Sequence, residues 1–233
     1  MRYLVIGAAG HAQEVAWSLR EQARAAGMPV EFLFFDDGQP VGPLASDLGE
    51  VVGEIDRVGE HACGDEVELV LGVGLPRTKR RLVARLAHLG VRWATVVHPL
   101  ATLGPNVTLG EGSYVGVGAV LTVSVRVGRF ATVNTHCQVA HDDVLGDFAT
   151  LHPDVHLAGC VSIGEGCELG TGAIVIPGIT IGDWAVLGAG CTAVQSLAGR
   201  HTYVGVPARM LPGDGPVVRR QGSPGAQRLE PGC

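Results

Sequence analysis

A six-residue repeat runs through most of the second half of the chain and excludes most folds. Counting in sixes from Leu103 to Leu187 places an aliphatic residue at every position. A period of six fits neither an α-helix nor a hairpin meander, whereas hexapeptide repeats indicate a parallel β-helix. The series is Leu103, Leu109, Val115, Leu121, Val127, Val133, Val139, Leu145, Leu151, Leu157, Ile163, Leu169, Val175, Ile181 and Leu187.

Each hexad is expected to supply one short strand and one turn, with its aliphatic residue pointing inward. A glycine often follows the aliphatic residue, and a residue free to adopt positive φ is expected at the corner. Solenoids of this kind are stabilised by stacking between neighbouring repeats. The pattern stops after Ala193, so residues 200–212 are expected to cap the coil. Residues 213–233 are rich in Pro, Gly and charge and are expected to be a disordered tail.

The first ninety-odd residues alternate strand and helix signals instead. Apolar runs at residues 3–6, 32–35 and 69–73 predict buried strands. A helix with Val15, Leu19 and Ala23 on one face is predicted between the first two runs, and another over residues 76–88. This order predicts a small, Rossmann-like parallel sheet with crossover helices. We therefore expect an α/β domain over residues 1–95 and an all-β domain over residues 96–212. A basic run in the last helix is expected on its outer face: Arg77, Lys79, Arg80 and Arg81.

The composition restricts the partners. A net charge of -6 at pH 7 gives no basic footprint for a nucleic acid. No apolar run reaches the length of a membrane span. The 6 cysteines show no zinc-site spacing and are expected to be buried thiols in a reducing, cytoplasmic setting.

Several short motifs are distributed along the chain, in the front domain, the repeat region and the cap. The first strand is followed by Gly7-Ala8-Ala9-Gly10-His11 and the second by Asp36-Asp37-Gly38, while His98-Pro99 marks the domain junction. The repeat region contains Val133-Asn134-Thr135, Ala140-His141-Asp142, Leu157-Ala158-Gly159 and Gly188-Ala189-Gly190, and the cap contains Val204-Gly205-Val206-Pro207-Ala208-Arg209.

Together these motifs resemble the bacterial nucleotide-sugar acetyltransferases, which include the bacillosamine and perosamine N-acetyltransferases and the sialic-acid O-acetyltransferase type. The resemblance implies a left-handed β-helix in which three hexads close one coil, so that residues 18 apart stack at about 4.8 Å. It also implies acetyl-CoA as the acyl donor, a nucleotide-linked amino sugar as the partner, a homotrimer and no metal.

Acetyl transfer needs a base, a donor for the developing oxyanion and two aligned substrates. His141 follows inward Val139 by two residues and is expected to face outward near a corner. The resemblance implies that His141 is the base and that Asp142 orients it. It also implies that the backbone N–H of Gly159, one layer away, binds the thioester carbonyl, and that Arg209 pairs with a CoA phosphate. The structural alternatives are a solvated turn histidine, a corner glycine and a plain cap.

The resemblance places the nucleotide sugar in the front domain. The turn from Gly7 to Gly10 lacks the third glycine of the dinucleotide fingerprint, but it suits the approach of a pyrophosphate, with His11 near the sugar. Asp36 and Asp37 follow a strand and could accept hydrogen bonds from ribose or base. Asn134 and Thr135 could contact the sugar. A solvated acidic turn and ordinary turn filling are the alternatives for these two pairs.

One position departs from the resemblance. The family commonly has a second histidine where Thr150 stands, nine residues after the base. His152 and His156 lie nearby but out of that register, so both are expected to be surface histidines.

The leading functional hypothesis is therefore an acetyl-CoA-dependent N-acetyltransferase acting on a nucleotide-linked amino sugar, with a 4-amino sugar favoured and no acyl-enzyme. O-acetylation of a sialic-acid-type sugar needs the same base and donor and stays open. A zinc hydratase of the β-helical carbonic anhydrase kind is suggested only by the spacing of His136 and His141, with His98 out of register as a third ligand. A scaffold without catalysis is the last alternative.

Overall fold

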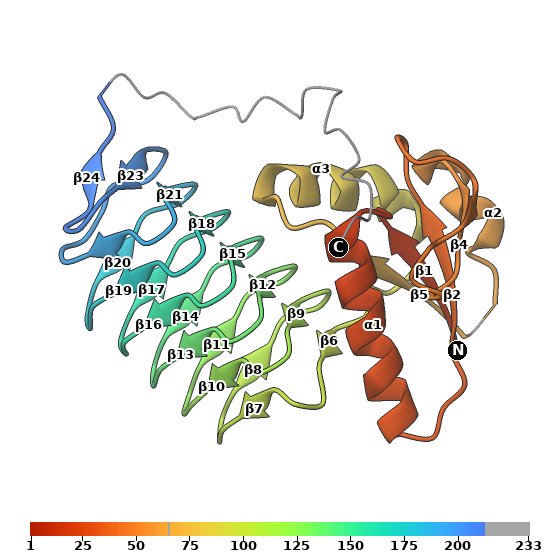
Figure 1. Ribbon diagram of the computed structural model, residues 1–233, viewed down its shortest axis with the longest axis horizontal. Helices are drawn as coiled ribbons and strands as arrows, with labels where there is room; N and C mark the ends of the chain where they lie inside the picture. The colour runs from red at the N-terminus through yellow and green to blue at the C-terminus, as the bar shows by residue number, and fades with distance from the viewer. Residues whose placement is uncertain (65, 213–233) are drawn as a thin grey trace, which may run out of the picture.

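The chain consists of a small α/β sheet domain followed by a long three-sided coil (Figure 1). The structure, a computed structural model, describes residues 1–64 and 66–212. The tail expected at 213–233 lies outside the described residues. Among the helices that are described, none is long and apolar enough to cross a membrane.

The front sheet has the strand order β3-β4-β2-β1-β5. Every pairing is parallel except that of β3 with β4. The three predicted strands are present, whereas the short β3 and β4 were not predicted because the stretch that holds them is rich in Gly and Pro. The strands are β1 (Arg2–Ile6), β2 (Glu31–Phe35), β3 (Gly42–Pro43), β4 (Glu50–Gly53) and β5 (Val67–Leu71).

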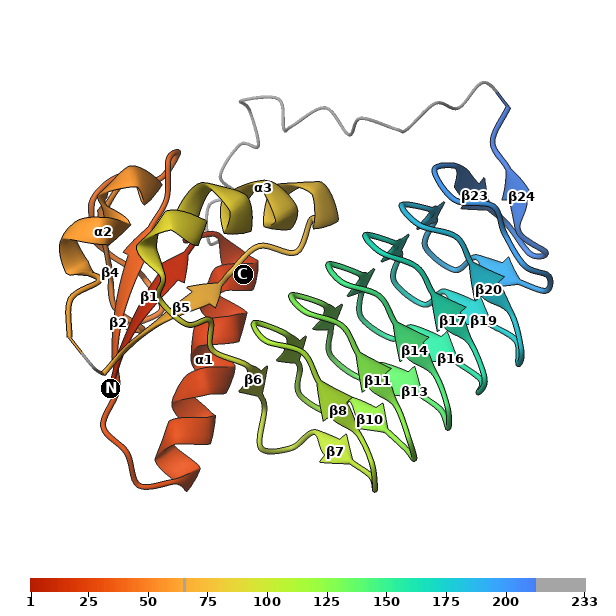
Figure 2. The ribbon, with the colours of Figure 1, turned by 180° about the vertical axis from the view of Figure 1, so that it is seen from behind.

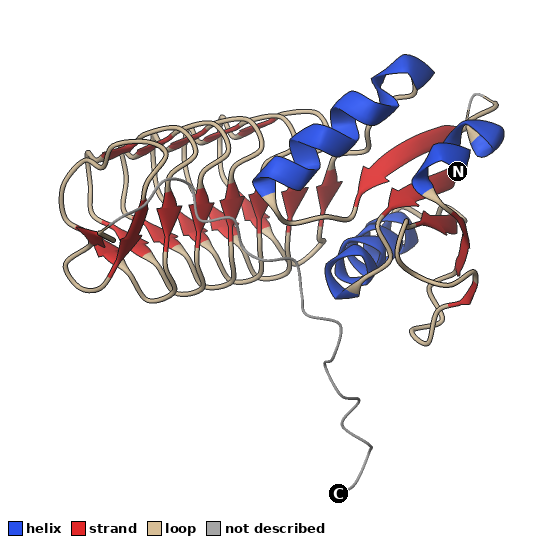
Figure 3. Cartoon of the chain, turned by 90° about the horizontal axis from the view of Figure 1, so that it is seen from above, coloured by secondary structure: helices blue, strands red, loops and turns tan. Residues whose placement is uncertain are grey.

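The front domain has two longer helices, and the second of them leads from the sheet into the coil. α1 (Gly10–Ala25) buries Val15, Leu19 and Ala23, so its predicted apolar face is confirmed. α3 (Pro76–Leu86) continues as the 3-10 turn η2 (Ala87–Leu89), and the short η1 (Ile55–Arg57) and α2 (Val58–His61) lie between β4 and β5. Figure 3 shows α3 lying along one side of the coil.

The repeat region forms two-residue strands that recur every six residues, and the second residue of each strand within residues 102–187 is the predicted aliphatic one. They are β6 (Val96–Val97), β7 (Thr102–Leu103), β8 (Thr108–Leu109), β9 (Tyr114–Val115), β10 (Val120–Leu121), β11 (Arg126–Val127), β12 (Thr132–Val133), β13 (Gln138–Val139), β14 (Val144–Leu145), β15 (Thr150–Leu151), β16 (His156–Leu157), β17 (Ser162–Ile163), β18 (Glu168–Leu169), β19 (Ile174–Val175), β20 (Thr180–Ile181), β21 (Val186–Leu187) and β22 (Thr192–Ala193).

These strands stack into three parallel sheets, one for each side of the coil (Figure 2). Partners stand 18 residues apart, as in the pairing of Val127 with Leu145, so the three-sided coil is confirmed. We name the sides after their first strands. The β6 face holds β6, β9, β12, β15, β18 and β21, the β7 face holds β7, β10, β13, β16, β19 and β22, and the β8 face holds β8, β11, β14, β17 and β20.

The hexad residues form one continuous core from Val115 onward. Leu109 is only partly buried against this core, and Leu103 is 40% exposed because β7 is the edge strand of its sheet. At the other end, the capping segment is confirmed. There β23 (Thr202–Val204) pairs with β21, β24 (Arg209–Met210) turns back antiparallel, and Tyr203 and Ala208 join the core.

The corners correct one sequence interpretation. The left-handed backbone conformation falls on the third residue after each aliphatic one, as at Asn106, His136 and Asp142, whose φ values are 60°, 56° and 61°. The glycine that directly follows the aliphatic residue serves close approach instead. A Cβ on Gly128 would stand 2.6 Å from the backbone of the next rung. Side chains can therefore occupy the corners, while glycine is required after those strands where the next rung approaches this closely.

Lys79 corrects a second interpretation, because it points into the protein and not outward from α3. It is 1% exposed, and its ammonium group donates to the carbonyl oxygens of Phe130 (2.8 Å) and Ala149 (3.1 Å) and to the hydroxyl of Thr132 (3.1 Å). Burial lowers the pKa of Lys79 well below its usual value, and the charge of Glu168 opposes that effect. Lys79 therefore joins α3 to the β6 face.

The other basic residues of this run do lie outside. The guanidinium groups of Arg77 and Arg80 lie 5.2 and 4.4 Å from the ring centroid of Trp184, which stands on the corner between the β8 and β6 faces. Phe130 and Phe148 stack on the same corner with their centroids 5.3 Å apart. α3 thus packs along a ladder of aromatic corner residues.

Asp143 interrupts the inward series, because it occupies a position that small apolar residues fill in most rungs. It is 0% exposed, and one carboxylate oxygen accepts the N–H of Val161 at 2.8 Å. Burial raises the pKa of Asp143 from 3.8 to about 6, while the N–H groups of Val161 and Ala140, the charge of His141 and the N–H of Gly159 act in the opposite direction. A charge is thus buried inside the coil.

Replacing Lys79 with Ala should lower the free energy of unfolding by about 3 kcal/mol, because three buried acceptors lose their donor. Chemical denaturation measures the change. Arg81→Ala, an exposed position on the same helix, is the matched control and should change stability by less than about 0.5 kcal/mol. Equal effects for the two variants would contradict the assignment of Lys79 as a buried link.

Replacing Asp143 with Asn should stabilise the protein more at pH 7.5 than at pH 4.5. A carboxyl whose folded pKa is raised binds its proton more tightly when folded, so its ionisation costs stability above about pH 6 and that cost fades as the pH falls toward 3.8. The shift of about two units corresponds to about 3 kcal/mol at most.

Thermal unfolding of the wild type and the variant at both pH values tests this expectation. Asp147→Asn is the control, because Asp147 also accepts an N–H across a rung but stays in contact with solvent. A stability difference between Asp143→Asn and wild type that does not change with pH would contradict the prediction.

Candidate active site

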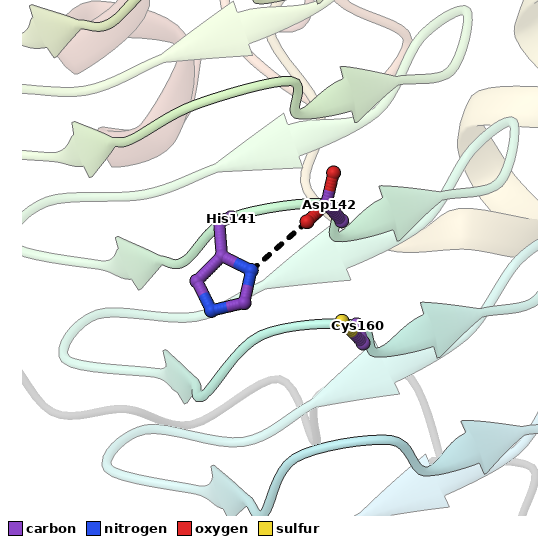
Figure 4. A group of neighbouring side chains, drawn as sticks. All are labelled: His141, Asp142 and Cys160. Carbon is purple, nitrogen blue, oxygen red and sulfur yellow. Dashed lines mark hydrogen bonds and ion pairs between the residues drawn. The ribbon is translucent and has the colours of Figure 1, made fainter.

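His141 and Asp142 form an exposed hydrogen-bonded pair on the corner between the β7 and β8 faces (Figure 4). The Nδ1 of His141 lies 2.9 Å from the Asp142 carboxylate, and the two side chains are 61% and 60% exposed. An ionised carboxylate only accepts hydrogen bonds, so Nδ1–H donates and Nε2 keeps its lone pair. The predicted outward position of His141 is confirmed, and its free nitrogen has the form that a base requires.

The repeat itself fixes this pair. Asp142 occupies the left-handed corner position, and the N–H of Cys160 on the next rung donates to the carbonyl oxygen of His141 at 2.9 Å. The backbone of the corner is therefore fixed by a hydrogen bond from the next rung, while both side chains extend into solvent. Because the pair is anchored by bonds between rungs, its geometry depends on the coil and not on a flexible loop.

Gly159 lies directly against the imidazole, one rung from His141, as the 18-residue spacing predicts. A Cβ at this position would stand 2.9 Å from Nε2 of His141, and its φ of +102° is one that side chains rarely adopt. Both observations require glycine here. The space beside Nε2 is thus kept open by a bare backbone, and the role of its N–H as a carbonyl donor stays a proposal.

Cys160 lies on the same corner, and no motif in the sequence pointed to it as a site residue. It stands 18 residues after Asp142, in the same left-handed corner position of the next rung. One ligand atom each from His141, Asp142 and Cys160 lie within 4.8 Å of one another. The count that pairs His141 with Gly159 would also have paired Asp142 with Cys160.

The expectation that all cysteines are buried was wrong for two of those described. Cys63 and Cys160 are exposed, whereas Cys137, Cys167 and Cys191 are buried. Burial raises the pKa of Cys137 to about 12 and that of Cys167 to about 11, so these thiols stay protonated. The sixth cysteine lies in the undescribed tail.

A groove of about 240 Å³ crosses three rungs of the β7 face and reaches the corner that holds His141 and Asp142, which we call the catalytic corner because His141 is the candidate base. Its walls include Ala140 and Ala158, the residues directly before His141 and Gly159, and His156 on strand β16. His156 was expected to be an ordinary surface histidine, but it lines this groove. The sequence could have indicated this place, because His156 is the outward residue of its strand and stands 18 residues after Gln138, which also lines the groove.

The glycine turn of the front domain is held by β2. The N–H of Gly7 donates to Phe35 O at 2.8 Å, and the φ of Gly7 is +101°. Ala9, the N-cap of α1, provides no side-chain cap, and Gly10 has open space around it. The first N–H groups of α1 are therefore available to an anion. His11 stands beside this turn, with its ring 5.7 Å from that of Tyr114 on the coil.

Asp36 and Asp37 are both engaged within the chain. The Asp36 carboxylate accepts N–H groups from Ala8 and Gly38, each at 2.8 Å. Asp37 accepts from Arg85 at 2.6 Å and from the N–H of Ile55 at 3.0 Å, and the Arg85 hydrogen bond lowers its pKa. The first carboxylate shapes the glycine turn, and the second fixes the end of β2.

Asn134 and Thr135 lie on the corner of the coil between the β6 and β7 faces. Asn134 is buried, and its side-chain oxygen accepts the N–H of partly buried Thr135 at 2.8 Å. His152, one rung above, lies 3.0 Å from Glu168 and is therefore not a free surface histidine. Thr150 donates to the carbonyl oxygen of Gly74 at 2.7 Å and so contacts the front domain.

One copy of the chain does not bring all predicted site residues together. The front domain packs on the β6 face, while His141 and Asp142 occupy the corner opposite that face. Arg209 lies in the cap, more than three rungs from His141, and its guanidinium group bonds the carbonyl oxygen of Ala208. The residues therefore form three groups: the catalytic corner, the front-domain turn and the cap.

The histidines that suggested a hydratase are separated. His136 is on the corner between the β6 and β7 faces, where it lies 3.9 Å from Asp154, and His141 is on the next corner. His98 is buried against Trp17, and burial lowers its pKa. Over residues 1–64 and 66–212, the one group with metal-ligand spacing is His141, Asp142 and Cys160, which is not a three-histidine site.

Curated relatives of this chain include a GDP-perosamine N-acetyltransferase and several serine acetyltransferases. The family model "hexapeptide repeat of succinyl-transferase" matches residues 160–192. GDP-perosamine N-acetyltransferase of Escherichia coli O157:H7 is 29% identical over 90 residues, which are 39% of this chain and 41% of that protein. The chain thus spans less than half the length of this curated relative.

Solved structures match over nearly the whole chain. The acetyltransferase domain of PglB from Neisseria gonorrhoeae FA1090, in complex with acetyl coenzyme A, is 31% identical with a TM-score of 0.82, over 90% of this chain and 98% of that one. PerB from Caulobacter crescentus, in complex with CoA and GDP-perosamine, is 32% identical with a TM-score of 0.79, over 91% and 97%. With this identity and coverage, the chain belongs to the hexapeptide-repeat family of nucleotide-sugar acetyltransferases.

Proposed function

We propose that the chain transfers the acetyl group of acetyl-CoA to the amino group of a nucleotide-linked amino sugar, with a 4-amino sugar favoured. The observation that carries this proposal is the exposed His141–Asp142 pair, whose Nε2 is free beside Gly159. The structures of PglB and PerB that resemble it contain acetyl-CoA or CoA, and PerB also contains GDP-perosamine.

The reaction is a direct displacement. Nε2 of His141 removes a proton from the sugar amine as its nitrogen attacks the thioester carbonyl. Asp142 accepts the Nδ1–H bond and stabilises the imidazolium that forms. The N–H of Gly159 is the proposed donor to the oxyanion. When the tetrahedral intermediate collapses, the C–S bond breaks, and the CoA thiolate takes up the proton that His141 holds. No residue becomes acylated.

The groove on the β7 face suits the pantetheine arm of CoA. It follows the coil and ends at Ala140 and Ala158, so a thioester at that end meets His141 and Gly159. Rungs are spaced at about 4.8 Å, so the cap lies about 15 Å or more farther along the coil. Arg209 is then placed for the phosphate end of the CoA molecule.

The front domain, residues 1–95, is the proposed nucleotide-sugar domain, ahead of a left-handed β-helix over residues 96–212. The uncapped start of α1 and the bare turn at Gly7 and Gly10 suit a pyrophosphate. His11 is placed beside the sugar. Because the carboxylate oxygens of Asp36 and Asp37 have further lone pairs, these residues can still accept from ribose or base.

A homotrimer explains why one copy has an incomplete site. The front-domain turn and the catalytic corner lie on different sides of the coil, so a sugar bound by one copy needs the His141 of a neighbour. Apolar side chains exposed on or beside the β7 face support contact there: Val123 is 45% exposed, Ile174 42% and Val194 45%. Asn134 and Thr135 are then placed to contact the sugar.

Replacing His141 with Ala should lower the rate of acetyl transfer by about 10²- to 10⁴-fold, because the general base is lost. The assay is thiol release from acetyl-CoA with a panel of UDP-, GDP- and dTDP-linked amino sugars and their hydroxyl counterparts. Turnover of hydroxyl sugars alone would assign O-acetylation in place of N-acetylation.

His136→Ala, at an exposed corner of the same coil, is the control for His141→Ala and should keep wild-type activity. Equal activity of His141→Ala and His136→Ala would contradict the assignment of His141 as the base.

Replacing Gly159 with Ala should also abolish most transfer while the coil stays folded, because a methyl group 2.9 Å from Nε2 displaces the imidazole. Gly172→Ala is matched for backbone strain, since its φ is +69° and nothing lies within 4 Å of its Cβ position. Circular dichroism and the transfer assay of both variants separate strain from obstruction. Equal loss of activity would show that strain alone is responsible.

A further inference from the structure

The catalytic corner presents three different ligand types at one point of the surface. The imidazole of His141, the carboxylate of Asp142 and the thiol of Cys160 each offer one atom, and these atoms lie within 4.8 Å of one another (Figure 4). They come from two successive rungs. Asp142 and Cys160 occupy the same corner position 18 residues apart, so the stacking of the coil sets their separation.

This donor set suits zinc. A thiolate, an imidazole and a carboxylate are all zinc ligands, with bonds of about 2.0 to 2.3 Å, whereas Mg²⁺ and Ca²⁺ prefer oxygen alone. Nδ1 of His141 and the Asp142 carboxylate are 2.9 Å apart, and two such ligands of a tetrahedral ion stand about 3.3 Å apart. Cys160 is exposed, so rotation of its side chain can bring the sulfur into range without moving the core.

The charge of the surroundings also favours a cation. Asp143 lies buried directly after the pair, and one of its carboxylate oxygens accepts the N–H of Val161 at 2.8 Å. None of the ion pairs within residues 1–64 and 66–212 joins a lysine or arginine to His141, Asp142 or Asp143. Asp143 stands behind the three donors and adds to the field that attracts a positive ion.

We propose that His141, Asp142 and Cys160 form an inhibitory site for one zinc ion, with water in the fourth position. Zinc binds Nδ1, so the ring proton moves to Nε2 and the lone pair that the base needs disappears. The Cys160 thiol gives its proton to solvent as the Zn–S bond forms. No electron transfer is involved. The inhibition rests on the proposed function, whereas the binding does not.

Cobalt(II) provides a direct test of the ligands, because a thiolate bound to Co²⁺ gives a charge-transfer absorption in the near ultraviolet. The full chain carrying Cys63→Ser and Cys233→Ser, in a reductant that is not a thiol, should develop this band at one Co²⁺ per chain, and Zn²⁺ should abolish it. Adding Cys160→Ser should remove the band and weaken metal binding by about 10- to 100-fold. A band that survives Cys160→Ser, or that never forms, would overturn the site.

The inhibition is tested with the same proteins. Zinc should stop acetyl transfer in the parent and a chelator should restore it, while Cys160→Ser should require about 10- to 100-fold more zinc to lose half of its own zinc-free rate. Equal zinc sensitivity of the parent and Cys160→Ser would overturn the inhibitory role. If the cobalt band forms but no nucleotide amino sugar is ever acetylated, the metal site stands and the proposed function fails.

Discussion

The stacking of each rung on the next, through parallel hydrogen bonds between residues 18 apart, is the constraint on which the rest of the structure depends. It buries one aliphatic residue per hexad and repeats every corner at the same place along the coil. Where neighbouring rungs approach most closely, the residue after a strand has no room for a side chain, as at Gly128. Reactive side chains such as His141 therefore lie on the corners or on the outward faces of the coil.

The catalytic corner shows how this constraint produces function. His141 and Asp142 are neighbours in one corner, and their counterparts one rung up are Gly159 and Cys160. In the proposed reaction, one rung supplies the base and its orienting acid, and the next supplies the bare backbone beside it. The same register that makes a base accessible also puts a thiol beside it, so the corner can favour proton transfer and metal binding at once.

The sequence alone predicted those features that depend on period. The inward series and the outward His141 follow from counting, and the family resemblance added the 18-residue stacking that puts Gly159 against His141. It did not predict which corner residue takes the left-handed conformation, because glycine is frequent at a different position for a different reason, close approach. Nor could counting place Lys79, since a basic run on a helix looks solvated until the carbonyl groups of another domain are brought to it.

Lys79 and Asp143 share one explanation, although they lie on different faces. Each is a charge buried where an apolar residue would cost less, so neither is explained by stability alone. Lys79 meets carbonyl oxygens on two successive rungs and so fixes α3, and with it the front domain, at one level of the coil. Asp143 accepts an N–H from the rung that carries Gly159 and Cys160, beneath the catalytic pair. Both charges therefore define register, one between domains and one between rungs. In the proposed trimer, where the two halves of the site come from different copies of the chain, that register decides whether sugar and thioester meet at the same level of the coil.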